Sequence, residues 1–312
     1  MQLQIDVSQN IFHQFAAQLR SITEVENNVL KVKAAFGEGK FTFYEFPNQL
    51  ELYHLASYSK LEMSIRSQNP IDSEWLLCNI NLSNQAVEKT VNDQAINIQK
   101  YLPSGILIYT PQTQVFSASP AHTRFEIALV RFHRSFLTHY LNQDLPILAN
   151  TDRAVIYEDL NYYLEKSLRN ALQTSNKISA HAHLLGFMGG VIEKLQQRSA
   201  DVAFEDLHPE DLKGLFLAAA YLRNPLALDI PSVNQLAETA GMGITKFKTT
   251  FKQVFGTPPI QYHRKIKLEY AREELTTQRK TATELSYELG YSHPSKFTTA
   301  YKKQFGVVPS QA

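Results

Sequence analysis

Cysteine is almost absent from this sequence, since Cys78 stands alone among 312 residues. One thiol cannot form an internal disulfide, and it cannot supply a zinc cluster built from thiolates. So little cysteine is typical of a reducing compartment, and we therefore expect a cytoplasmic protein. The start of the chain also lacks a basic segment followed by an apolar one, and the longest apolar run, 215–222, is far too short to span a membrane. We expect neither export nor membrane insertion.

The sequence has no strong net charge, because 31 Lys and Arg against 30 Asp and Glu leave +1. The charges are nevertheless unevenly distributed. Residues 231–312 hold 12 Lys and Arg against 6 Asp and Glu, which leaves 19 against 24 in residues 1–230. A basic C-terminal part joined to a mildly acidic remainder is the asymmetry expected when one domain meets a polyanion. The alternative is two solvated surfaces that differ by chance.

The length and the 44% hydrophobic content suit two domains better than one core, and we place them at 1–200 and 201–312. After an opening helix expected at 8–19, residues 29–132 read mostly as short strands, because apolar and polar residues alternate between turns. Helical periodicity then takes over in the segments 136–141, 157–172, 178–197 and 212–223, with a polar linker at 198–209. The predicted fold class is α+β: an antiparallel β-barrel with trailing helices, then an all-α domain.

One pattern is written twice near the C-terminus, about fifty positions apart, because 236–259 returns as 285–309 with one extra residue in its turn. A duplication of this size indicates two copies of one supersecondary unit. In the first copy, Ser232 and Gln235 can form a capping box, and Gly241 can end the helix in a left-handed conformation before a second helix at 245–254. Each copy is predicted to be a helix, a tight glycine turn and a second helix.

The second helix of each copy has one apolar stripe. Phe247, Phe251 and Phe255 are spaced four residues apart, and Phe297, Tyr301 and Phe305 repeat that spacing. Burial of the stripe leaves a face rich in Lys, Ser and Thr, which has the shape and chemistry to enter a DNA major groove. An ordinary helical hairpin with a solvated face is the alternative, and the duplication of the same face argues against it.

Between the two copies, residues 260–275 are predicted to form a connecting helix of about 24 Å. Such a helix can hold two recognition helices about one DNA turn apart, roughly 34 Å, on one face of a duplex.

Residues 212–312 resemble the DNA-binding domain of AraC/XylS-type transcription regulators, which consists of two helix-turn-helix units and a connecting helix. The residues that carry the resemblance are Leu236-Ala237, Gly241-Met242, Phe251-Lys252, Phe255-Gly256, Tyr262, Leu268, Ala271, Leu275, Glu288-Leu289-Gly290-Tyr291-Ser292, Lys296-Phe297, Tyr301-Lys302-Lys303, Phe305-Gly306 and Pro309. The chain departs from the family at Gly243, where a capping Ser is usual, at Lys267 in place of Arg, and at Ser286 in place of Ala.

The resemblance implies which side chains meet DNA. The base contacts would be Thr245, Lys248 and Thr249 in the first unit, and Ser295, Lys296, Thr298 and Thr299 in the second. The phosphate contacts would be Lys246, Lys252, Lys302 and Lys303. Because the first recognition helix has Gly243 at its start while the second has Ser292 and Pro294, we expect the second to be better ordered without DNA.

The resemblance also implies a cupin-like N-terminal barrel that binds a small-molecule effector, followed by helices that make a homodimer. Gly105 and Pro111 fit the start of a cupin signature, but Thr113 and Phe116 replace the residues that its metal-binding form requires. His181 and His183 lie two apart in a predicted helix and would point apart. We therefore expect neither a metal nor another cofactor. The candidate pocket residues are the strand aromatics Phe41, Phe43, Tyr53, Trp75, Tyr109 and Phe116; barrel core is the alternative role for each.

Together these features predict a sequence-specific transcription regulator with double-stranded DNA as its partner, a small-molecule effector, and RNA polymerase as a further candidate partner. In a second hypothesis the barrel is only a dimerisation scaffold without a ligand. A third makes the chain a cupin-type enzyme or an alkyl-transfer protein with a DNA-binding appendage. The missing histidines and the single cysteine argue against that hypothesis.

Overall fold

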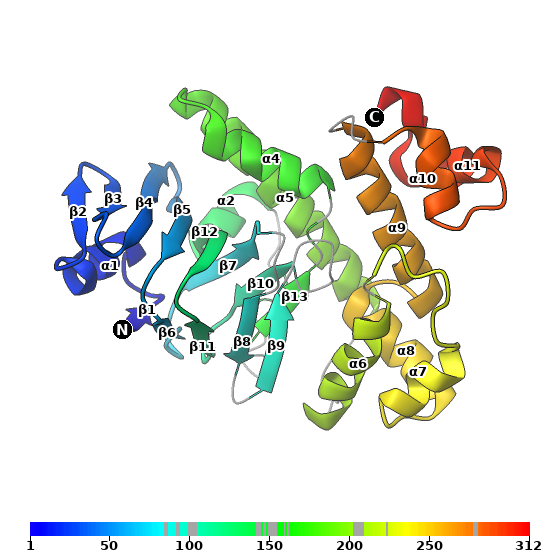
Figure 1. Cartoon of the computed structure of the whole chain (residues 1–312). Helices are drawn as coiled ribbons and strands as arrows, with labels where there is room; N and C mark the ends of the chain where they lie inside the picture. The colour runs from blue at the N-terminus through cyan, green and yellow to red at the C-terminus, as the bar shows by residue number, and fades with distance from the viewer. Residues whose placement is uncertain are drawn as a thin grey trace. The chain divides into compact units, whose positions relative to one another are not determined.

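The computed structural model describes residues 1–83, 87–91, 94–98, 105–141, 145, 148, 155–158, 160, 162–201, 209–222, 224–276 and 280–312. The chain divides into two compact units, Met1–Ala200 and Asp201–Ala312 (Figure 1). In the described residues, no helix is both long and apolar enough to cross a membrane.

The first unit is built on two β-sheets. The five-stranded sheet has the order β1-β6-β11-β8-β9, and the eight-stranded sheet has the order β13-β10-β7-β12-β5-β4-β3-β2. The strands are β1 (Gln2–Asp6), β2 (Thr23–Glu26), β3 (Val29–Val32), β4 (Gly37–Phe46), β5 (Leu50–Ser59), β6 (Met63–Gln68), β7 (Trp75–Asn81), β8 (Val87–Val91), β9 (Gln94–Ile98), β10 (Ile106–Tyr109), β11 (Gln114–Ser119), β12 (Thr123–His133) and β13 (Val155–Glu158).

The predicted antiparallel sheet structure is confirmed with one exception. Among the described strands, β1 pairs with β6 in parallel, with Leu3 opposite Ile65, whereas the other pairings are antiparallel. Helix α1 (Ile11–Leu19) follows β1 directly, so the opening segment contributes an edge strand as well as the predicted helix. That helix begins at Ile11 rather than at residue 8, because the Asn10 side chain accepts a hydrogen bond from the His13 amide and caps it.

Helices cover one face of the eight-stranded sheet (Figure 1). They are α2 (Arg134–Tyr140), α4 (Tyr162–Gln173) and α5 (Lys177–Asp201). Alternate residues of β5, including Leu50 and Leu52, join Leu168 of α4 and Phe187 of α5 in one buried cluster. Arg169 of α4 joins the helices to the sheet, because it donates to both carboxylate oxygens of Glu126 on β12, at 3.2 and 3.3 Å. It also donates to Glu165 of its own helix at 2.7 Å. The opposite face of the sheet is left for the second sheet and α1.

Two predicted boundaries in this unit need correction. The predicted helix at 157–172 begins at Tyr162, because residues 155–158 form β13 and pair with β10, with Ile156 opposite Ile108. β-Branched and aromatic side chains favour such pairing over a helix. The predicted linker at 198–209 begins later, since α5 continues to Asp201; residues 202–208 lie outside the described part of the chain.

The second unit is helical in its described residues apart from turns and loops. Its elements are α6 (Pro209–Tyr221), α7 (Val233–Thr239), α8 (Ile244–Phe255), α9 (Pro259–Thr276), α10 (Ala282–Glu288), α11 (Pro294–Phe305) and the 3₁₀ turn η1 (Pro309–Gln311). α9 runs between the pair α7–α8 and the pair α10–α11 (Figure 1). It supplies Tyr262 and Ile266 to the core of the first pair, and Leu268 and Ala271 to the core of the second.

Candidate functional site

A cavity of about 100 Å³ lies in the first unit between the two sheets, beneath α1. Alternate residues of a strand point to the same face of a sheet, and Leu55, Ser57 and Ser59 of β5 accordingly line the cavity together. Ile11, Phe15 and Leu19 of α1 close it. The lining is apolar with a few hydroxyl and amide groups, as is usual for sites that bind small organic molecules.

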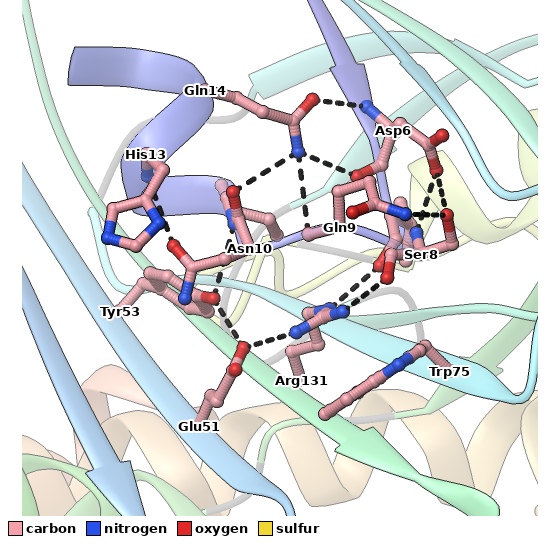
Figure 2. Close-up of polar contacts among 12 residues, drawn as sticks. Asp6, Ser8, Gln9, Asn10, His13, Gln14, Glu51, Tyr53, Trp75 and Arg131 are labelled. Atoms are coloured by element: carbon pink, nitrogen blue, oxygen red, sulfur yellow. Dashed lines mark hydrogen bonds and ion pairs between the residues drawn. The ribbon is translucent and has the colours of Figure 1, made fainter. Parts of the chain in front are cut away.

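A hydrogen-bond network holds the turn that precedes α1 and the first residue of that helix (Figure 2). Arg131 Nη1 lies 2.6 Å from a carboxylate oxygen of Glu51, and the same guanidinium donates to the carbonyl oxygens of Val7 and Ser8 at 2.7 Å. Its carbon Cζ also lies 3.5 Å from the centre of the Trp75 ring. Hydrogen bonds to an opposite charge and to two carbonyl oxygens offset the cost of burying this guanidinium. The network ties the turn before α1 to strands β5 and β12.

Tyr53 extends the network to α1 itself. Its hydroxyl accepts from the Ile11 amide at 3.3 Å and donates to Glu51. Burial and the neighbouring carboxylate hold the pKa of Tyr53 well above its ordinary value, so the phenol stays protonated. The first turn of α1 is therefore bonded to the barrel.

The first helix pair of the second unit has the predicted turn. Ser232 and Gln235 form the capping box at the start of α7, and Gly241 has a φ of 67°. Glycine adopts that left-handed conformation without steric strain, whereas a residue with a Cβ is strained in it. Gly243 stands at the N-cap of α8 without a side-chain bond, as the sequence indicates.

The second helix pair repeats the plan with different capping. Thr281 and Glu284 form a capping box at the start of α10, which the sequence argument missed although the Thr-x-x-Glu spacing is its usual signature. Gly290 takes a φ of 78° in the turn. The N-cap of α11 is His293, without a side-chain bond, so Ser292 does not cap this helix as expected. Pro294 at its first position remains the one difference in favour of the second recognition helix.

Both apolar stripes are buried as predicted. The ring centres of Phe247 and Phe251 lie 5.4 Å apart, and those of Phe251 and Phe255 lie 4.3 Å apart. In α11 the corresponding distances along Phe297, Tyr301 and Phe305 are 5.7 and 4.6 Å. Each helix is thus held by its own row of three contacting aromatic rings, which we call its ring ladder. The two helices therefore expose equivalent faces.

A family model described as a helix-turn-helix domain matches residues 236–312. Residues 236–312 are thus an AraC-type helix-turn-helix domain. The virulence regulon transcriptional activator VirF of Yersinia enterocolitica is 31% identical over 104 residues, which are 33% of this chain and 36% of VirF. The XylDLEGF operon transcriptional activator 2 of Pseudomonas putida is 38% identical over 82 residues, which are 25% of this chain and 52% of that protein. The matches therefore span about a third to a half of these relatives.

Among solved structures, ToxT of Vibrio cholerae is 13% identical, with a TM-score of 0.34 over 84% of this chain and 96% of ToxT.

The AraC-type domain exposes most of the side chains predicted to meet DNA. Exposed residues are Thr245, Lys246, Lys248, Thr249 and Lys252 on α8, and Ser295, Lys296, Thr299, Lys302 and Lys303 on α11. Thr298 is half-buried, and the Thr299 hydroxyl donates to the Ser295 carbonyl oxygen at 2.9 Å. Lys246 differs from the other lysines, because its ammonium lies 2.6 Å from a carboxylate oxygen of Asp211. A phosphate would have to compete with that carboxylate for Lys246.

α9 of the AraC-type domain also contacts the second turn directly. Lys267 donates to the carbonyl oxygen of Leu289, the last residue before Gly290, at 3.1 Å. Burial lowers the pKa of Lys267 from its ordinary value. This lysine, which replaces the family's usual Arg, still reaches an unpaired carbonyl at the end of α10 and helps to fix the turn.

The six aromatic residues predicted for the effector pocket do not share one cavity. Phe41 lies in the wall of the cavity beneath α1, and Phe116 lies in the wall of a more open pocket of about 570 Å³. Phe43 and Tyr53 stack on each other with ring centres 5.0 Å apart, and neither lines either hollow. Trp75 packs on Arg131, and Tyr109 is buried with its hydroxyl accepting from Asn79 at 3.2 Å.

The sequence argument missed the most unusual residue of the cavity wall, Lys89 of β8. It lies on the inner face with Val87, while Glu88 between them points outward. A period-two reading of Val87-Glu88-Lys89-Thr90-Val91 would have found a lysine on an apolar face. The fold shows what that pattern could not, namely that the face borders a cavity.

In the part of the chain that the structure describes, no group of three or more His, Cys, Asp or Glu side chains could hold a metal ion. His181 lies in α5, where its ring stacks on Phe46 with centres 5.2 Å apart.

Proposed function

We propose that this chain is a sequence-specific, DNA-binding transcription regulator whose activity responds to a small molecule held in the N-terminal cavity. The observation that supports it best is the pair of equivalent helices, α8 and α11, that each turn lysines and hydroxyl groups outward from a buried ring ladder. Lysine ammonium groups attract phosphates, and Lys and Thr side chains can read base edges in a major groove. The curated relatives that match this domain are described as transcriptional activators, which agrees with the proposal.

The predicted DNA contacts can be tested by measuring sequence discrimination, which depends on base contacts, separately from overall DNA affinity, which depends on phosphate contacts. We expect Lys248→Ala and Thr249→Ala to reduce discrimination between a selected operator and random DNA, by about 1–3 kcal/mol where a base contact is lost. We expect Lys302→Ala to weaken both DNAs alike and to reduce the salt slope of log K by about 1. The measurement is fluorescence anisotropy at several salt concentrations, with an operator obtained by selection from random DNA.

Lys40→Ala is the matched control, because Lys40 is an exposed lysine on β4 of the other unit and its loss changes the net charge equally. Equal losses on operator and random DNA for Lys248→Ala, Thr249→Ala and Lys302→Ala would contradict the assignment of the two helix faces.

The cavity supports effector binding over a barrel that serves only as a scaffold, because a scaffold needs no apolar hollow with polar groups in its wall. A metabolite that binds there should raise the melting temperature of the chain, since a ligand that binds only the folded state stabilises it. We include a homodimer in the proposal, with α4 and α5 as candidate contact helices. RNA polymerase is a candidate partner of the DNA-bound form.

We also propose that the protein has no catalytic role. Burial raises the pKa of the Cys78 thiol to about 12, so the nucleophilic thiolate is scarce at neutral pH. The cytoplasmic location that the cysteine content suggests is part of the same proposal, because a regulator must reach the genome.

A further inference from the structure

Lys89 is a buried lysine without a carboxylate partner among the described residues. Its side chain lies on β8 in the five-stranded sheet, and the residue is 4% exposed. The ammonium donates a hydrogen bond to the Ser117 hydroxyl oxygen on the neighbouring strand β11, at 2.8 Å. A hydroxyl oxygen satisfies one of its three N–H groups and does not neutralise its charge.

The cavity beneath α1 holds no opposite charge, since among the described residues that line it Lys89 is the one charged side chain, with apolar residues and Ser, Thr and Asn around it. Glu62 and Glu88 line the more open pocket, but neither carboxylate forms an ion pair with Lys89 in the part of the chain that the structure describes. Burying an ammonium without an opposite charge is costly, and burial lowers the pKa of Lys89 to about 8. A methionine or leucine would fill the same space without that cost, so the lysine has a use that packing does not explain.

We propose that the barrel cavity binds a small amphipathic acid, whose apolar body occupies the hollow beneath α1 and whose anionic group pairs with the Lys89 ammonium. The proposal rests on the proposed effector role of the N-terminal unit and names the chemical class of the effector. Ser117 positions the ammonium, and its hydroxyl can in turn donate to the acid.

The size of the hollow limits the apolar body. A dry cavity of about 150 Å³ can bind benzene, and the cavity here is smaller, about 100 Å³. Its apolar walls include Phe15, Phe41 and Leu129. A short alkyl chain is therefore the expected size of the apolar body.

The position of Lys89 also explains where the acidic end would lie. Val87, Lys89, Ser119 and Phe125 line both the cavity beneath α1 and the more open pocket. Lys89 therefore lies where the apolar cavity meets a pocket whose wall also contains charged side chains, among them Glu62 and Arg124. A ligand held with its acidic group at this junction would keep that group hydrated on one side and paired on the other.

The experiment is isothermal titration of the full chain with butanoate, butyl phosphate and butan-1-ol, which share one short alkyl chain. We expect the wild type to bind at least one of the two acids, and at least 10-fold more tightly than the alcohol. Lys89→Met should weaken acid binding at least 10-fold and leave alcohol binding unchanged or improved. Lys40→Met, on the exposed face of β4, is the matched control and should bind all three probes like the wild type.

Any of three results would overturn the proposal. The wild type could bind neither acid, it could bind acid and alcohol equally, or Lys89→Met could retain full acid affinity. The first two comparisons use the wild type alone, so they decide the matter even if Lys89→Met does not fold. A preference for carboxylate over phosphate, or the reverse, would identify the kind of acid.

DNA binding is measured separately, by selection from random DNA without any probe. If the chain selects an operator but the acids do not bind, the cavity proposal fails and the DNA-binding proposal stands. If the acids bind through Lys89 but operator affinity does not respond to them, the site stands and its regulatory role fails.

Discussion

Lysine side chains of this protein differ in what surrounds each ammonium group. Lys246 lies against Asp211 and Lys280 bonds to both carboxylate oxygens of Glu288, at 2.6 and 2.7 Å. Lys89 is buried beside one hydroxyl, whereas Lys248 is exposed on α8. Residue type alone therefore does not assign a phosphate contact. Surface pairs contribute little to stability, so Lys246 can still exchange its carboxylate partner for a phosphate.

His263 is expected to make the stability of the AraC-type domain depend on pH. Its ring nitrogen Nδ1 lies 2.9 Å from the Leu222 carbonyl oxygen, and burial holds its pKa below the ordinary value of 6.5. The unfolded chain therefore takes up a proton before the folded chain does, so the contribution is present above pH 6.5 and is lost as the pH falls through the folded pKa. His263→Asn keeps a donor near that carbonyl and removes the titration.

The measurement is calorimetric melting between pH 7.5 and 5, taken as the difference between wild type and His263→Asn. The wild type should lose more stability than the variant as the pH falls. Parallel pH profiles would show that His263 does not titrate as expected.

Individual helices are defined by short local signals, and these signals differ in strength between the first and the second helix of each pair. α7 and α10 both begin with a complete capping box. α8 and α11 begin without a side-chain cap, and both end at a left-handed glycine, Gly256 with a φ of 71° and Gly306 with 76°. α8 and α11 thus rely on their buried rings more than on their first turns.

Gly243→Ser is expected to stabilise the AraC-type domain by a few tenths of a kcal/mol. Gly243 has the extended conformation of an N-cap, with φ −66° and ψ 147°, and a Cβ there would meet nothing within 4 Å. A serine hydroxyl can accept from an amide of the first turn that α8 leaves unpaired. Amide exchange across α8 and the melting temperature would measure the gain.

Gly243→Ala is the control, because it adds the Cβ without the hydroxyl. If the alanine variant is as stable as the serine variant, the effect comes from the loss of glycine flexibility and the capping argument fails.

The described residues form separate hydrophobic cores, which include one beneath the helices of the first unit and two along α9 in the second. Such cores allow a ligand of one unit to stabilise that unit by mass action alone. The single tryptophan, Trp75, lies on β7 and stacks on Arg131, so its fluorescence reports the first unit. This gives a way to follow the two units separately.

A saturating amphipathic acid should raise the melting transition seen by Trp75 fluorescence, by about 2.7 kcal/mol of stability at 100 times its Kd. Operator DNA should instead raise a transition seen by helical circular dichroism without the same shift in fluorescence. A common shift of both signals with either ligand would mean that the units unfold together.

Much of the C-terminal domain followed from the sequence, because its determinants are local. The spacing of Phe247, Phe251 and Phe255 predicts the buried stripe, and Ser232, Gln235 and Gly241 predict the cap and the turn; the structure confirms each. The strand β13 was missed because Val155–Glu158 is short and extended only through its pairing with β10. Strand assignment depends on partners far away in the chain, which a local pattern does not contain.

The sequence by itself determined the two helix-turn-helix units, since helix periodicity, caps and glycine turns act over a few residues. Only the tertiary structure decided what the first unit offers, because a cavity is made by side chains from strands distant in sequence. Lys89 of β8 and Ser117 of β11 meet through strand pairing, and Phe15 of α1 and Phe41 of β4 close the hollow beside them. Their common environment, and with it the unbalanced charge of Lys89, exists only after folding.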